Sequence, residues 1–230
     1  MKMPTLRLSA LTLATLVLSG VAAAQQPETT IKGAEEENAP LPSADSMKEW
    51  PCVQGKVETL SVTAIWDGPS VDDPEVKDWQ KVPEITRLIE TLASRRVPVD
   101  KAEETLKKFA ESQPADVRDK RLTQVFAGLF NTVNNQRKTV ITGIGRYQKS
   151  QKARSVELER QSTAIGELEQ KAPADEKAAA DLATAQEQFQ WAQRIFQERQ
   201  TSIPLACELP TLIEERLYEI TRTIRGLMKA

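Results

Sequence analysis

The fold is decided by residues 158–189, which read LERQSTAIGELEQKAPADEKAAADLATAQEQF. Pro173 divides this stretch into two arms, because proline cannot continue a helix through its own position. After it, apolar residues recur at spacings of four and three, at Ala178, Leu182, Ala185 and Phe189. Such spacing places them on one face of a helix. A connector as short as 172–175 between two such arms predicts an antiparallel helical hairpin.

The first arm extends upstream as a predicted helix from about Ala115 to Lys171. Its apolar residues follow two heptad series, which is the pattern of a helix with one continuous contact seam. They are Phe126, Phe130, Val133, Val140, Ile144, Tyr147, Leu158, Ile165 and Leu168. Folding back near residue 173 predicts that Leu158 lies opposite Phe189 and that Leu168 lies opposite Ala178.

Polar residues and glycines interrupt this long arm. Arg137, Gln151 and Gln161 occupy seam positions, so the hairpin buries only a modest apolar area. Gly143 and Gly145 lie mid-segment, and each costs a helix about 1 kcal/mol relative to alanine. A continuous helix over this arm would span about 85 Å at 1.5 Å per residue. The sequence leaves open whether the helix bends or breaks at Gly143–Gly145.

Further helices are predicted on both sides of the hairpin. One starts at Pro83, and a second runs from Asp100 to before Pro114. The last follows Pro210, with apolar residues at spacings of four and three (Ile213, Leu217, Ile220, Ile224, Leu227). The sequence therefore predicts an all-α fold. Residues 83–230 form a helical bundle, and a long coiled-coil-like hairpin of about residues 145–200 projects from it.

An irregular strap is expected over residues 50–82, before the bundle. Asp67-Gly68-Pro69 is a turn signal, and Val57–Trp66 has the composition of a short extended segment. Trp66 and Trp79 are large enough to pack this strap onto the helices that follow it.

Residues 1–24 have the three parts of a secretory signal peptide. Lys2 and Arg7 form the charged start, residues 8–21 form an apolar run, and Ala22–Ala24 supply a small-residue cleavage site. The apolar run is shorter than the about 20 residues of a spanning helix, which argues against a retained membrane anchor. We therefore expect a periplasmic protein, exported and cleaved near Ala24.

Export determines how the two cysteines of the chain are interpreted. In an oxidising compartment Cys52 and Cys207 are expected to form a disulfide. A reactive thiol is the competing interpretation. It is disfavoured because the sequence has no histidine to act as a base and no CxxC motif.

The charge of the chain is unevenly distributed. The net charge is −2, and because residues 1–24 hold two bases and no acid, the rest of the chain has a net charge of −4. Residues 25–49 hold six acids and two bases, which accounts for all of that excess. With several prolines and few large apolar residues, this segment is expected to be a disordered acidic linker.

Enzymatic chemistry has little support in the sequence. The 230 residues include no histidine, which removes the commonest general base near neutral pH and the commonest metal ligand. Two cysteines are too few for a structural zinc site. The acidic clusters 35–37 and 72–73 lack the ligand spacing of a calcium loop. We therefore predict no catalytic residues, no cofactor and no metal.

One helical stretch is strongly basic. Residues 137–154 contain six bases and no acid. The bases are Arg137, Lys138, Arg146, Lys149, Lys152 and Arg154. Such a face fits an anionic partner, including lipid headgroups, although a solvated helix face has the same composition. Nucleic acid is not an expected partner of an exported, acidic protein.

Trp191 and Ile195 form a second candidate surface. They are four residues apart and offset from the seam that runs through Leu182, Phe189 and Phe196. This offset leaves two alternatives: burial against a third helix, or an exposed patch that anchors a protein partner.

These features favour a non-enzymatic periplasmic protein that binds another protein, as an adaptor, assembly factor or chaperone. The alternative is a helical bundle that binds lipid or another anionic ligand at the periplasmic membrane surface. The sequence does not specify the partner or the oligomeric state.

Overall fold

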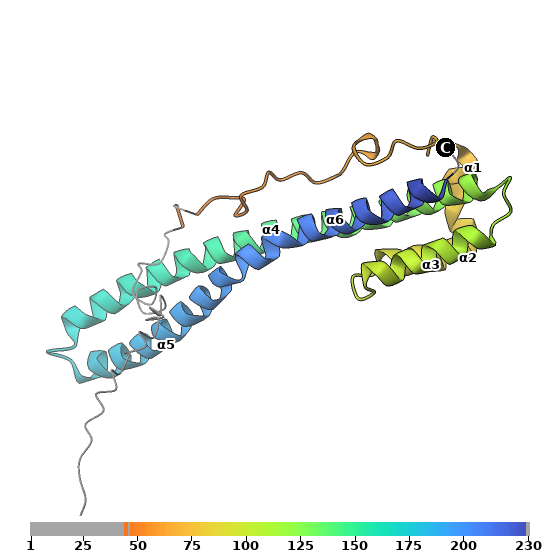
Figure 1. Ribbon diagram of the computed structural model, residues 1–230. Coiled ribbons are helices and arrows are strands. Elements are labelled where there is room, and N and C mark those ends of the chain that lie inside the picture. Colours follow the sequence, from red (N-terminus) through yellow and green to blue (C-terminus); the bar gives the residue numbers. More distant parts are fainter. Residues whose placement is uncertain (1–43, 46, 229–230) are drawn as a thin grey trace, which may run out of the picture. The chain divides into compact units, whose positions relative to one another are not determined.

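A computed structural model describes residues 44, 45 and 47–228 of the chain (Figure 1). The predicted signal peptide and most of the acidic linker lie outside this part. The described residues contain no strand, which confirms the all-α fold. The elements are η1 (Val62–Ala64), α1 (Pro74–Lys77), η2 (Asp78–Lys81), α2 (Pro83–Ala93), α3 (Val99–Ser112), α4 (Arg118–Lys171), α5 (Glu176–Thr201) and α6 (Ile203–Leu227).

The long helix α4 is continuous through both glycines, so the helix does not break at Gly143–Gly145. A Cβ atom added at Gly143 or Gly145 would meet nothing within 4 Å, so neither glycine marks a close helix contact. At 1.5 Å per residue, α4 is about 80 Å long.

Helices α4 and α5 form the predicted antiparallel hairpin, with the connection at residues 172–175 (Figure 1). The Tyr147 hydroxyl donates to the Arg199 carbonyl at 2.9 Å, and Gln151 Nε2 lies 3.5 Å from the Phe196 carbonyl. Leu158 packs in one cluster with Phe196 and the partly buried Phe189. These contacts have the register expected from folding back near residue 173.

The main hydrophobic core lies where α2, α3, the first half of α4 and the second half of α6 meet. Its fully buried side chains include Ile85, Leu106, Phe126 and Ile220, which recur on one face of each amphipathic helix. Gly128 of α4 lies against Ile89 and Trp79, where an added Cβ would overlap both side chains. Glycine is needed here because α2 and η2 approach the α4 backbone closely.

The last helix begins earlier than the sequence predicted. Instead of starting after Pro210, α6 begins at Ile203 and contains Pro210 inside it. Pro204 lies in the first turn, where proline is tolerated, and Pro210 is buried. A proline inside a helix removes one backbone hydrogen bond, but packing on both sides retains the helical path here.

The strap before α2 contains no strand among its described residues, so the expected extended segment at Val57–Trp66 was wrong. Its Leu60 amide bonds to Asn134 Oδ1 of α4 at 3.0 Å, and the chain then turns through η1. A lone strand has no neighbour to receive its hydrogen bonds, whereas α4 supplies one. Trp66 stacks on Phe126 with ring centroids 4.0 Å apart, which anchors the strap to the core.

Contacts of the strap begin before residue 50. Ala44 and Met47 are buried, and the Ala44 amide donates to Glu159 Oε1 at 3.0 Å. Gln148 Nε2 of α4 donates to the Lys48 carbonyl at 2.6 Å. The residues from Ala44 onward that the structure describes therefore lie along the hairpin.

Candidate functional site

The disulfide ties the strap to α6, as the sequence predicted. The Cα atoms of Cys52 and Cys207 are 5.5 Å apart. Gln54 Nε2 donates to the Cys207 carbonyl, one turn before the buried Pro210. The strap is thereby held against α6 by a covalent bond and a hydrogen bond.

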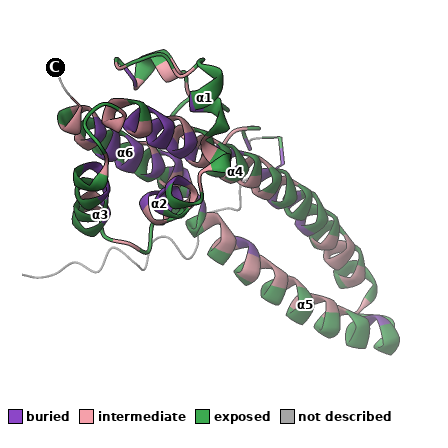
Figure 2. Ribbon diagram, turned by 90° about the vertical axis from the view of Figure 1, so that its right-hand side faces the viewer, coloured by how far each residue is buried: buried purple, intermediate pink, exposed green. Residues whose placement is uncertain are grey.

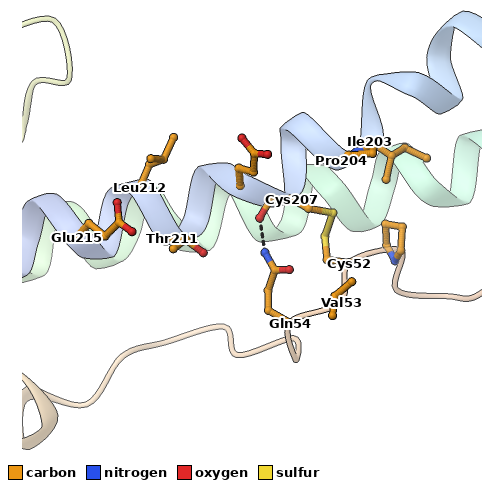
Figure 3. Close-up of a pocket in the computed structure, with 11 residues that line it drawn as sticks. Cys52, Val53, Gln54, Ile203, Pro204, Cys207, Thr211, Leu212 and Glu215 are labelled. Atoms are coloured by element: carbon orange, nitrogen blue, oxygen red, sulfur yellow. Dashed lines mark hydrogen bonds between the residues drawn. A yellow bond between two sulfur atoms is a disulfide. The ribbon is translucent and has the colours of Figure 1, made fainter. Parts of the chain in front are cut away.

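A groove of about 660 Å³ lies between the strap and α6 at this point (Figure 3). We call it the disulfide groove. Its lining residues are Pro51, Cys52, Val53 and Gln54 of the strap and Ile203, Pro204, Cys207, Glu208, Thr211, Leu212 and Glu215 of α6. Most of the lining is apolar, and Val53 is fully exposed. The groove was not expected from the sequence, because much of its α6 wall lies before Pro210, and the last helix was predicted to begin only after that proline.

Two carboxylates stand on the α6 side of the disulfide groove. Glu208 and Glu215 are seven residues apart, so they lie on one side of the helix. Both are exposed, and neither forms an ion pair with a described residue. An apolar floor next to unpaired acids is complementary to an apolar segment that carries a positive charge.

An apolar stripe runs along the outer side of α5 and α6, adjoining the disulfide groove at Leu212. We call it the outer stripe. Its members follow one another at spacings of four and three: Trp191, Ile195, Glu198, Ser202, Leu205, Leu209 and Leu212. Ser202, between the two helices, has right-handed helical dihedral angles, so the pattern continues from α5 into α6. This stripe differs from the seam through Phe189 and Phe196 that faces α4.

The outer stripe is exposed to solvent. Trp191 is 62% exposed, Leu205 is 66% exposed and Leu212 is 50% exposed, while Ile195 and Leu209 are partly buried (Figure 2 shows the exposed side of α5). The sequence left two alternatives for Trp191 and Ile195: burial against a third helix, or an exposed patch. Among the described residues, no third helix covers Trp191. Arg194 lies 5.9 Å from the Trp191 ring centroid, a cation–π contact at the edge of the stripe.

The outer stripe ends where the loop between α2 and α3 covers α6. Arg216, four residues after Leu212, is buried and donates to the Leu92 and Val97 carbonyls, each at 2.8 Å. Burial lowers the pKa of the Arg216 guanidinium, opposed by the nearby Glu219 carboxylate. The loop thus covers the helix face at Arg216 and leaves the stripe from Trp191 to Leu212 open.

The six predicted bases do not form one face. Arg137 is buried and pairs with Glu214 of α6 and the Val57 carbonyl of the strap, so it does not belong to an exposed surface. Lys152 pairs with Glu49 at 3.0 Å. These two bases connect elements of the fold. Arg137 was misassigned because a charge run in the sequence does not show which turn of the helix faces a neighbour.

The remaining bases are exposed and form no ion pair with a described residue. At 3.6 residues per turn, Lys138, Arg146 and Lys149 lie within about 80° of one another on α4, and Arg154 lies further round. Beyond them, Glu157 ends the acid-free stretch. Hydrogen bonds from Arg160 and Gln161 lower its pKa to about 2. A smaller basic face thus remains at Lys138, Arg146 and Lys149.

The buried contact between α4 and α5 is partly polar. Gln151 is buried against α5, and Gln148 is buried beside the strap on the same arm. The side-chain oxygens of both glutamines have no hydrogen-bond partner among the described residues. Each unsatisfied buried acceptor costs about 1–3 kcal/mol. The two arms are therefore held less tightly than the core beneath α2 and α3.

The described residues contain no group of three or more acids and cysteines placed to hold a metal ion. Both cysteines are in the disulfide. None of the described helices carries an apolar run suited to crossing a bilayer. Three surfaces of the described residues combine exposure with a distinct chemical character: the disulfide groove, the outer stripe and the smaller basic face.

Comparison of the chain with protein-family models, with curated proteins and with solved structures finds no match. The fold defines an all-α protein with a long helical hairpin and a disulfide-tied strap. Its function is therefore inferred from its own surfaces.

Proposed function

We propose that this chain is a non-enzymatic periplasmic protein that binds another protein, and that the partner lays a helix on the outer stripe. The observation that carries the proposal is the exposure of Trp191, Leu205 and Leu212 on one helical face. Large apolar side chains at heptad spacing are the usual contact surface for an amphipathic helix. A role as adaptor, assembly factor or chaperone fits such a surface.

The length of the outer stripe suits a helical partner. Residues 191–212 cover about three heptads, or about 32 Å at 1.5 Å per residue. The polar Glu198 and Ser202 stand in its middle, between an apolar pair on α5 and three leucines on α6. A partner helix would therefore bring apolar residues to both ends of the contact and polar residues to its centre.

The charges beside the outer stripe favour a basic partner. Glu187, Glu208 and Glu215 lie along one edge at multiples of seven residues, in a series that also contains Arg194 and Thr201, and Glu198 lies on the stripe itself. Charge does not select against a second copy of this chain, because the antiparallel pairing of Trp191 with Leu209 that brings Glu187 near Glu215 also brings Arg194 near Glu208. A basic amphipathic helix of another protein meets the same acids favourably.

A peptide titration tests the proposal. The probe is a fluorescein-labelled amphipathic peptide of roughly three heptads, with leucine at the core positions and lysine at the flanks. We expect it to bind at least about ten-fold more tightly than a twin with glutamate flanks. Replacing Trp191→Ser or Leu205→Ser should weaken binding about ten-fold or more, because tryptophan is enriched among the residues that dominate contact affinity and each replacement removes a large apolar side chain from the buried contact. Fluorescence anisotropy gives both constants.

Val156→Ser is the matched control, because Val156 is exposed on α4 away from the outer stripe. Equal affinity for both peptides, or an equal loss in the control variant, would refute the outer stripe as the site. Vesicles containing anionic phosphatidylglycerol test the second candidate function, lipid binding. That function is favoured by the exposed Lys138, Arg146 and Lys149. Vesicle binding that is lost in the K138E/R146E/K149E variant but kept in Trp191→Ser would support it instead.

A further inference from the structure

The disulfide groove has a size and a lining unlike those of the outer stripe. Its volume of about 660 Å³ lies within the range of pockets that bind small ligands, roughly 300–1,000 Å³. One wall is the irregular backbone of the strap at Pro51–Gln54, and the other is α6 (Figure 3). At the disulfide the Cα atoms of the two walls are 5.5 Å apart, which is less than the width of a helix with its side chains, about 10 Å. The groove instead fits an extended segment.

The lining specifies the chemistry of the occupant. Pro51, Val53 and Pro204 offer apolar contact surface. The backbone at the two prolines is rigid, because the proline ring fixes φ. Glu208 and Glu215 add two negative charges on one side. Among the described residues, no base lines the groove. An aliphatic side chain can therefore fill the apolar part while a neighbouring lysine or arginine reaches the carboxylates.

The strap wall depends on the disulfide for its position. Around residues 51–54, the only hydrogen bond between described residues of the strap and α6 is the one from Gln54 to the Cys207 carbonyl. The next contacts of the strap are with α4: Lys48 with Gln148, Glu49 with Lys152, and Val57 with Arg137. Without the covalent bond, one side-chain hydrogen bond holds this wall against α6.

We propose that the disulfide groove is a second binding site, for an extended protein segment with an aliphatic residue beside a lysine or arginine, and that it is formed only in the oxidised chain. The site shares Glu208, Leu212 and Glu215 with the surface of the proposed function, but it does not rest on that function, because its strap wall at Pro51–Gln54 is not part of the outer stripe. One partner chain can occupy both, since the two surfaces adjoin at Leu212.

The probe is a fluorescein-labelled decapeptide, rich in proline to prevent helix formation, in which two valines are flanked by lysines. A twin carries glutamates in place of the lysines. We expect the oxidised chain to bind the lysine peptide at least about five-fold more tightly. Glu208→Lys with Glu215→Lys should reverse this preference. Glu90→Lys with Glu111→Lys makes the same charge change on α2 and α3 and should leave the preference intact.

Dithiothreitol tests the redox dependence. It supplies two electrons and two protons, so the disulfide becomes two thiols and dithiothreitol becomes a cyclic disulfide. Reduction should weaken lysine-peptide binding about ten-fold or more, while far-UV circular dichroism shows that the helices remain. An unchanged preference in the E208K/E215K variant, or full binding after reduction, would overturn the proposal. Trp191→Ser should not affect this peptide, so failure here and failure at the outer stripe are distinguishable.

Discussion

Reduction of the Cys52–Cys207 disulfide is expected to lower the melting temperature by about 10–20 °C. The bond joins residues 155 positions apart, so it closes a loop that contains most of the described chain. In the chain-entropy model a loop of this length contributes about 5 kcal/mol to the free energy of unfolding. Each kcal/mol shifts the melting temperature of a chain this size by about 2–4 °C.

Differential scanning calorimetry with and without dithiothreitol measures this difference. The C52A/C207A variant should melt near the reduced protein and should not respond to dithiothreitol, which separates loss of the bond from other effects of the reagent. A melting temperature that is the same in the oxidised and reduced protein would show that the bond contributes nothing to stability.

Phe126→Ala is expected to reduce the free energy of unfolding by about 3–5 kcal/mol. Phe126 is fully buried in α4, and its ring is stacked on Trp66 at an interplanar angle of 9°. Its removal leaves a cavity at the point where the strap meets the bundle, and Trp66 loses its stacking partner. Urea unfolding followed by circular dichroism measures the change as a shift in the transition midpoint.

Phe189→Ala is the matched control, because it makes the same truncation at a partly buried position of the hairpin. We expect a loss below about 2 kcal/mol there, since less apolar surface leaves the interior. Equal losses in the two variants would contradict the view that the core beneath α2 and α3 is more tightly packed than the hairpin.

The helical part of the fold could be predicted from local pattern. Apolar spacing and Pro173 predict the positions of α2, α3 and α5 and the register of α4 on α5. The reason is that apolar residues on the buried face of a helix recur every three or four positions along the sequence. The cysteine pairing followed from there being two cysteines in the chain. These features depend on residues close in sequence or on simple counting.

Features that depend on distant neighbours could not be predicted. Pro210 is a helix breaker by local rules, but packing on both sides keeps it inside α6. Arg137 is one of six bases in a run, yet Glu214 and the strap make it a buried connection. The disulfide groove combines residues about 150 positions apart, so no local pattern in the sequence predicts its apolar lining.

A photo-crosslinking amino acid placed at position 191, in cells that express the chain, tests whether another protein lies on the outer stripe. Position 156 is the exposed control. We expect one discrete adduct from position 191 that is lost when Leu205→Glu is added, and none from position 156. Equal adducts at the two positions, or no adduct from position 191, would show that no partner protein lies on the outer stripe.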